Sequence, residues 1–127
     1  MPTILVVDDE PSIRRLLRAA LERGGYAVLE APDGPAALRV ARESQPALVL
    51  LDVALPRMSG LEVCRRLRDD PPTSRTPVLL LSGVSSAEPQ KLAQSGASGW
   101  LAKPFTPESL LERVGALLGV PARLQAR

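Results

Sequence analysis

The chain has 127 residues, with 16 Lys plus Arg against 14 Asp plus Glu, a single cysteine and no histidine. Its 45% hydrophobic and 24% charged residues fit one globular domain and exclude a disordered chain, a collagen or a coiled coil. The lack of histidine excludes Ser-His and Cys-His catalytic pairs and any histidine metal site. Any chemistry must therefore rest on carboxylates, hydroxyls and lysine.

Apolar, β-rich runs alternate with helix-like segments along the whole chain. The strands are predicted over residues 3–8, 26–30, 47–52, 78–82 and 99–103. The helices are predicted over residues 13–21, 33–44, 61–68, 85–96 and 106–118. This alternation predicts an α/β domain, a doubly wound parallel sheet with right-handed crossovers and helices on both faces. We expect the domain to cover residues 1–119, with residues 120–127 as a C-terminal tail or the start of a linker.

The first helical segment has a clear apolar stripe. The residues at helical spacing are Ile13, Leu16, Leu17, Ala20 and Leu21. Its arginines, Arg14, Arg15 and Arg18, are expected to form a solvated face.

The later helices differ in how well they are supported. Asp33 and Thr106 are suited to cap the second and fifth helices. The fourth helix has the weakest pattern, because Pro89 must sit in its first turn and only Leu92 and Ala93 give it an apolar face.

Several observations bear on compartment and partners. Cys64 cannot form an internal disulfide, and acids stand where a signal peptide needs an apolar stretch, so we expect the cytoplasm. The longest apolar run, ALVLLDVAL, carries Asp52 and is too short to span a membrane. An excess of two positive charges with no basic run gives direct nucleic-acid binding no electrostatic support.

Polar residues close four of the predicted strands. In an open parallel sheet, ligands bind beyond the carboxyl ends of the strands. The residues found there are Asp8, Asp9, Glu10, Asp52, Ser82 and Lys103. Crowded carboxylates repel unless a cation neutralises them, and hard oxygen ligands suit Mg²⁺. Because a carboxylate can attack phosphorus to give an aspartyl phosphate, this set of groups supports phosphoryl transfer to Asp.

Four motifs resemble the receiver domain of the response regulators of two-component signalling. They are VVDDEP at 6–11, LVLLDVALPRMSG at 48–60, LLLSG at 79–83 and GASGWLAKPF at 96–105. The similarity covers about residues 3–119. It implies a flavodoxin-like receiver fold, a five-stranded sheet of order 2-1-3-4-5.

The resemblance also assigns a role to each residue at the strand ends. It implies that Asp9 binds Mg²⁺ directly and Asp8 through water, with the Ala54 backbone carbonyl completing the metal shell. Asp52 is then the phosphoryl acceptor. Ser82 bonds a phosphoryl oxygen and moves the following loop, while Lys103 pairs with the phosphoryl charge.

The resemblance raises three further expectations. Trp100 stands where the family usually has a Tyr or Phe switch residue, and we weigh a switch role equally with edge-strand packing. Ala54 and Val84, two residues after Asp52 and Ser82, cannot hydrogen-bond an attacking water, so we expect slow self-dephosphorylation. The Lys103-Pro104 peptide is a candidate cis bond, as is common in the family.

We therefore expect a phosphorylation-controlled switch, a signalling domain and not a turnover enzyme. A sensor histidine kinase or histidine phosphotransfer protein, or a small phosphodonor, supplies the phosphoryl group, and an unknown protein or output domain responds. A haloacid-dehalogenase-type phosphatase is a rival, but it needs a second Asp where Ala54 stands. The other alternative is a receiver-like binding module that acts without phosphorylation, by constitutive protein contact.

Overall fold

The computed structural model describes residues 1–83 and 89–119. Its strands are β1 Thr3–Val7, β2 Ala27–Ala31, β3 Leu48–Asp52, β4 Val78–Ser82 and β5 Gly99–Ala102. Its α-helices are α1 Pro11–Arg23, α2 Gly34–Ser44, α3 Gly60–Asp69, α4 Pro89–Gln94 and α5 Pro107–Leu117, with a short 3₁₀ turn at Pro71–Thr73. The predicted tail at 120–127 lies outside the described residues.

The five strands form one parallel sheet of order β2-β1-β3-β4-β5, as predicted. Val7 pairs with Leu51, so the residues that follow these two positions, Asp8 and Asp52, come next to each other at the carboxyl edge. Leu81 pairs with Asp52 on the other side of β3. The register therefore brings three strand ends together at one edge of the sheet.

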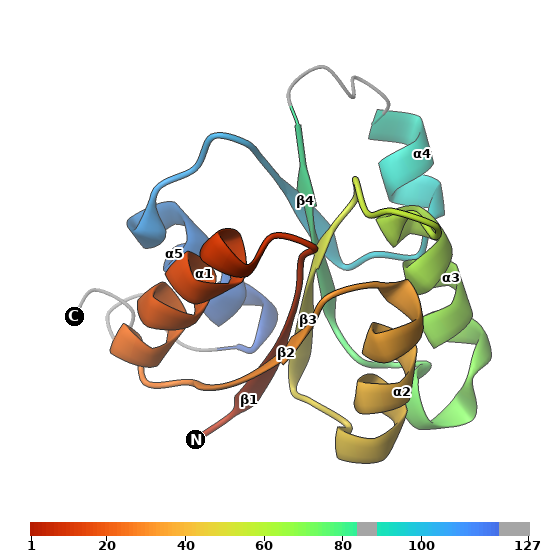
Figure 1. The fold of residues 1–127 in the computed structure, drawn as a ribbon, viewed down its shortest axis with the longest axis horizontal. Helices are drawn as coiled ribbons and strands as arrows, with labels where there is room; N and C mark the ends of the chain where they lie inside the picture. The colour runs from red at the N-terminus through yellow and green to blue at the C-terminus, as the bar shows by residue number, and fades with distance from the viewer. Residues whose placement is uncertain (84–88, 120–127) are drawn as a thin grey trace.

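The sheet is covered on both faces, and each face has its own buried core (Figure 1). α1 and α5 cover one face, where Val6, Leu50 and Leu79 pack against helix residues such as Leu21 and Val114. α2, α3 and α4 cover the other face. β3 and β4 are buried along their whole length, which explains why their sequences are continuous apolar runs and not alternating ones.

Side-chain caps fix where the helices begin. Asp33 accepts a hydrogen bond from the Ala36 backbone N–H at 2.9 Å, as predicted for the second helix. Thr106 and Ser109 form a reciprocal capping box at the start of α5. These caps place the start of each helix just past the edge of the sheet where the strand ends meet.

The structure corrects three expectations about helix faces. Leu16 is not buried with the rest of the α1 stripe but is 67% exposed. Arg14 is largely covered and ion-paired, so the arginines of α1 do not form one solvated face. In α4, Leu92 is buried as predicted, but Ala93 is exposed and the buried neighbour is Ser95. Within the described residues no helix is long and apolar enough to cross a membrane.

Candidate functional site

The pleat of the strands directs three polar side chains to the same face of the sheet. Successive strand residues point to opposite faces, and Val6, Leu50 and Leu101 all pack in the core under α1 and α5. Asp8, Asp52 and Lys103 lie two residues after these positions and therefore turn toward the same helices. A groove between the sheet edge and α1 is lined by all three residues.

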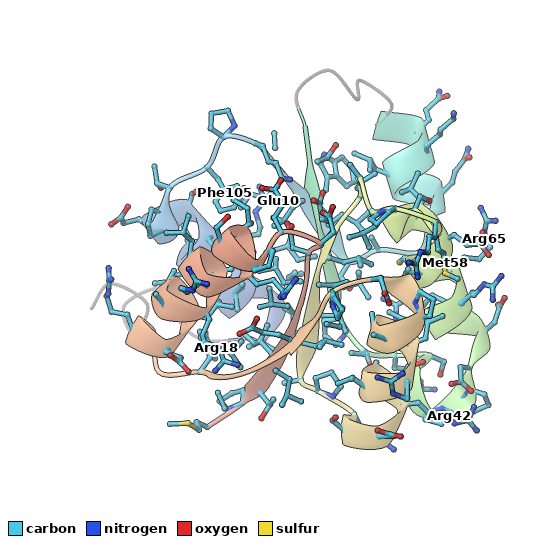
Figure 2. The ribbon with its side chains drawn as sticks, viewed as in Figure 1. Glu10, Arg18, Arg42, Met58, Arg65 and Phe105 are labelled. Atoms are coloured by element: carbon cyan, nitrogen blue, oxygen red, sulfur yellow. The ribbon has the colours of Figure 1, made fainter. Side chains whose placement is uncertain are left out.

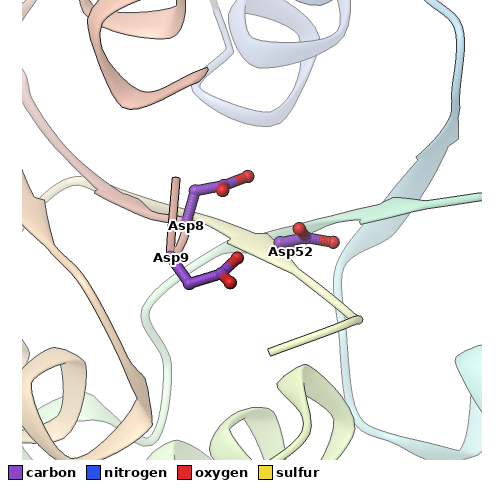
Figure 3. Close-up of side chains that lie close together, drawn as sticks. All are labelled: Asp8, Asp9 and Asp52. Atoms are coloured by element: carbon purple, nitrogen blue, oxygen red, sulfur yellow. The ribbon is translucent and has the colours of Figure 1, made fainter. Parts of the chain in front are cut away.

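Three carboxylates meet at this edge. Asp8, Asp9 and Asp52 each place one carboxylate oxygen within 4.8 Å of the others. Figure 3 shows the three side chains leaving the adjacent ends of β1 and β3. Asp8 and Asp52 are buried and Asp9 is exposed, so the cluster has one side open to solvent.

Asp8 is the most deeply buried member of the cluster. Oδ1 of Asp8 accepts a hydrogen bond from the Glu10 backbone N–H at 2.9 Å. Oδ2 is buried and has no hydrogen-bond partner among the described residues. Burial raises the pKa of Asp8 to about 6, the Glu10 amide opposes this shift, and the neighbouring Asp52 adds to it. A buried carboxylate oxygen without a partner is costly, and a bound cation would satisfy it. The donor set of the cluster therefore fits Mg²⁺, a hard ion that prefers carboxylate oxygens.

Asp52 has cationic and backbone partners. Its Oδ1 lies 3.2 Å from Lys103 Nζ and accepts a hydrogen bond from the Ala54 backbone N–H at 3.1 Å. The Lys103 side chain is 37% exposed while that of Asp52 is only 8% exposed. Lys103 therefore brings a charge to Asp52 from the solvent side, where an incoming anion would arrive.

The loop after Asp52 is held close by a glycine. Gly60 begins α3, and its backbone N–H donates to the Val53 carbonyl at 2.9 Å. A Cβ at Gly60 would collide with the Asp52 carbonyl oxygen and would lie 2.8 Å from Val53 Cα. Because both obstacles are backbone atoms, only glycine fits here, which explains the Ser59-Gly60 pair in the loop.

Of the remaining predicted site residues, Ser82 lies at the same edge, whereas Trp100 lies within β5, paired with Leu80. Ser82 ends β4 in a buried position, and its hydroxyl donates to the Gly83 carbonyl at 3.3 Å. Trp100 lies in the edge strand β5, 38% exposed, with its carbonyl accepting from Arg113 of α5 at 2.6 Å. The Lys103-Pro104 bond is cis. The switch roles of Ser82 and Trp100 stay predictions, as does metal binding by the Ala54 carbonyl. Val84 lies outside the described residues.

The groove continues from the acidic cluster over an apolar surface. It has a volume of about 420 Å³. Its apolar lining comes from α1, from Phe105 before α5 and from the first turns of α5: Ile13, Leu16, Leu17, Ala20, Phe105, Pro107 and Leu110. Glu10 and Phe105, which both line it, lie at the same end of the domain (Figure 2). The exposed Leu16 therefore belongs to an open apolar groove beside the carboxylates.

Sequence reasoning missed Arg14 as a member of the site. Its Nη1 donates to the backbone carbonyl of Asp8 at 2.7 Å, and its Nε pairs with Glu30 of β2 at 3.0 Å. No spacing pattern in the sequence signals a bond from a helix arginine to a backbone carbonyl. The charge of Glu30 at the carboxyl end of the neighbouring strand was the one available hint.

Comparison with known proteins decides the family. The response regulator receiver domain model matches residues 4–115. This chain belongs to the response regulator receiver domain family. Receiver domains are signalling domains of two-component systems and bind Mg²⁺ at an acidic pocket.

Individual relatives and solved structures agree with this assignment. The DNA-binding dual master transcriptional regulator RpaA of Synechocystis sp. is 43% identical over 93% of this chain, and the match covers 49% of RpaA. The chemotaxis protein CheY4 of Vibrio cholerae superimposes with a TM-score of 0.85 at 36% identity, covering 92% of this chain and 98% of that one. The receiver domain of sensor histidine kinase PA1611 from Pseudomonas aeruginosa, whose structure has a magnesium ion coordinated in the active-site cleft, gives 0.86 at 28% identity over 93% and 98%. The receiver thus spans about half the length of RpaA.

Proposed function

We propose that this receiver domain accepts a phosphoryl group on Asp52 in a Mg²⁺-dependent reaction and so switches a protein-interaction surface. The observation that carries the proposal is the pairing of Asp52 with Lys103 at 3.2 Å beside two further carboxylates. An oxygen of the Asp52 carboxylate attacks phosphorus. The bond from phosphorus to the donor breaks, and the donor leaves with that bond's electron pair.

The residues around Asp52 each contribute to this step. Asp8, Asp9, Asp52 and the Ala54 carbonyl would hold Mg²⁺, which when bound offsets negative charge on the transferring group. Lys103 places a second positive charge at the solvent side of Asp52. The Ala54 N–H fixes the orientation of the Asp52 carboxylate through Oδ1. Ser82, at the adjacent strand end, is proposed to bond a phosphoryl oxygen and to move the loop that follows it.

The phosphoryl donor is proposed to be a phosphohistidine on a sensor histidine kinase or a histidine phosphotransfer protein. This chain contains no histidine of its own. The apolar groove with the exposed Leu16 lies directly beside the acceptor, which supports a protein donor as well as a small phosphodonor. The proposed compartment is the cytoplasm, where the buried free thiol of Cys64 would stay reduced. The phosphorylated form is proposed to act by protein contact, on a downstream partner or an output domain, without direct nucleic-acid binding.

Ala54 bears on the alternatives and on the lifetime of the phosphoryl group. A haloacid-dehalogenase-type phosphatase needs an acid two residues after its nucleophile, and this position is Ala54. An alanine methyl group cannot orient an attacking water, so we propose that self-dephosphorylation is slow and that the chain is not a turnover enzyme.

The proposal is tested by incubating the protein with Mg²⁺ and acetyl phosphate or phosphoramidate and measuring its intact mass. We expect a gain of one phosphoryl group that is lost in Asp52→Asn and prevented by EDTA. Asp69→Asn is the matched control, because Asp69 is an exposed acid at the end of α3, away from the strand ends. An unchanged mass would favour the binding module that acts without phosphorylation. A gain that survives Asp52→Asn would place the acceptor elsewhere.

A further inference from the structure

A chain of charged contacts leads from the outer side of α1 to the acidic cluster. Arg18 pairs with Glu22 at 3.0 Å and with Glu30 at 2.6 Å. Glu30 also accepts from Arg14 Nε at 3.0 Å, and Arg14 Nη1 donates to the Asp8 carbonyl at 2.7 Å. The last contact is the only one of these that reaches the site.

The Asp8 carbonyl belongs to the peptide group that joins Asp8 to Asp9. This group is planar, so holding its oxygen fixes the orientation of the backbone on both sides. The Asp8 N–H donates to the Ala31 carbonyl at 3.2 Å, and Asp8 Oδ1 is held by the Glu10 N–H. Arg14 thus supplies the remaining constraint on a residue whose other carboxylate oxygen, Oδ2, is left for a cation.

The burial and geometry of Arg14 fit the holding of the Asp8 carbonyl better than they fit a surface ion pair alone. Its side chain is 16% exposed, against 36% for Arg18 on the same helix. Glu30 holds the guanidinium through Nε while Nη1 points to the Asp8 carbonyl, a two-point arrangement that a lysine ammonium cannot reproduce.

We propose that Arg14 is a positioning residue for the acidic site. It fixes the Asp8–Asp9 peptide group so that both carboxylates face the Mg²⁺ position, and Glu30 orients Arg14 for this task. The proposal rests on the proposed function, because it assumes that the acidic cluster binds Mg²⁺. Arg14 itself touches neither the cation nor the phosphoryl group.

The test compares Mg²⁺ affinity across variants of the full chain. Mg²⁺ alone is titrated while the backbone amide chemical shifts of residues 8–10 are followed by NMR, and urea unfolding is measured in parallel. Loss of a residue that orients a metal ligand typically weakens metal binding by about 10–100-fold. We expect Arg14→Met to weaken Mg²⁺ binding by about tenfold, at the low end of this range, and Arg14→Lys to fall between Arg14→Met and the parent.

Arg18→Met is the matched control. It removes an ion pair to the same Glu30 from the same helix but leaves the Asp8 carbonyl contact in place. We expect its Mg²⁺ affinity to stay within twofold of the parent. Equal weakening in Arg14→Met and Arg18→Met would show a general loss of α1 packing and would overturn the proposal, as would parent-like affinity in Arg14→Met.

Two further variants and the parent protein complete the test. If Arg14→Met fails to fold, Arg14→Lys and Glu30→Gln take its place, and parent-like affinity in both overturns the proposal. A parent that binds Mg²⁺ but accepts no phosphoryl group contradicts the proposed function, while the comparison of affinities still decides the role of Arg14. A parent that binds no Mg²⁺ contradicts both.

Discussion

Asp8 has a buried carboxylate that is held at one oxygen, while the other oxygen has no hydrogen-bond partner in the part of the chain that the structure describes. A pKa raised to about 6 means that the folded protein holds this proton more tightly than the unfolded chain does. The contribution of this proton to the free energy of unfolding is therefore fully present below about pH 4. It is lost as the pH rises through 6. At neutral pH without metal, the site destabilises the fold that carries it.

The first prediction follows from this loss of stability with rising pH. In EDTA at pH 7.5 we expect Asp8→Asn to raise the free energy of unfolding by about 1–3 kcal/mol, because a neutral amide avoids the buried charge and keeps the acceptor for the Glu10 N–H. At pH 4 the gain should vanish. Urea unfolding followed by fluorescence of Trp100, the single Trp, measures the free energy at each pH. A constant difference between parent and variant from pH 4 to 7.5 would contradict the assignment.

At the scale of one element, α4 depends on its neighbours. It has six residues, too few to be stable alone, and Leu92 is its one buried apolar side chain among those described. Arg68 of α3 joins the end of this region to the rest of the fold: Nε donates to the Gly96 carbonyl at 2.8 Å and Nη1 to the Thr76 carbonyl at 2.6 Å. Arg68 thus ties the residues just after α4 to α3, in addition to the packing of Leu92 in the core.

The second prediction concerns these hydrogen bonds of Arg68. We expect Arg68→Met to lower the free energy of unfolding by about 1–3 kcal/mol, because a charged donor loses its hydrogen bonds to backbone carbonyls, including the partly buried one to Thr76. Amide hydrogen exchange should speed up first in residues 95–99, before β1 and β3. Arg65→Met is the control, since Arg65 makes an exposed pair with Glu62 on the outer face of α3 (Figure 2), and its effect should stay below about 0.5 kcal/mol. Equal effects of the two variants would contradict the role of Arg68.

At the scale of the whole molecule, the sheet and its acidic edge could be predicted from the sequence. The two-residue period of a strand and the burial of its side chains fix which residues share a face of the sheet. The parallel arrangement of the strands then brings Asp8 and Asp52 together. The predicted burial of Leu16 was wrong, because helical spacing shows that a residue belongs to the apolar stripe but not whether another element covers it. Arg14 was missed because its partners, a backbone carbonyl and a glutamate on another strand, depend on how α1 lies over the sheet. Both failures concern the arrangement between elements, which local patterns do not encode.

The third prediction links the site to the stability of the whole fold. A ligand that binds only the folded state stabilises it by about 2.7 kcal/mol at 100 times its Kd. Mg²⁺ at that level should therefore stabilise the protein by about this amount at pH 7.5. At pH 5 the raised pKa of Asp8 keeps it mostly protonated, the apparent affinity falls about tenfold, and the stabilisation should drop to about 1.4 kcal/mol.

Urea unfolding with and without Mg²⁺ at matched ionic strength measures this difference, and Asp8→Asn should reduce its dependence on pH. Stabilisation by Mg²⁺ that is equal at pH 5 and 7.5 would mean that Asp8 does not compete between proton and metal. The same result would show that the buried oxygen of Asp8 is not part of the metal site. A loss of the stabilisation by Mg²⁺ near pH 6 would instead link the burial of this one side chain to the metal affinity of the domain.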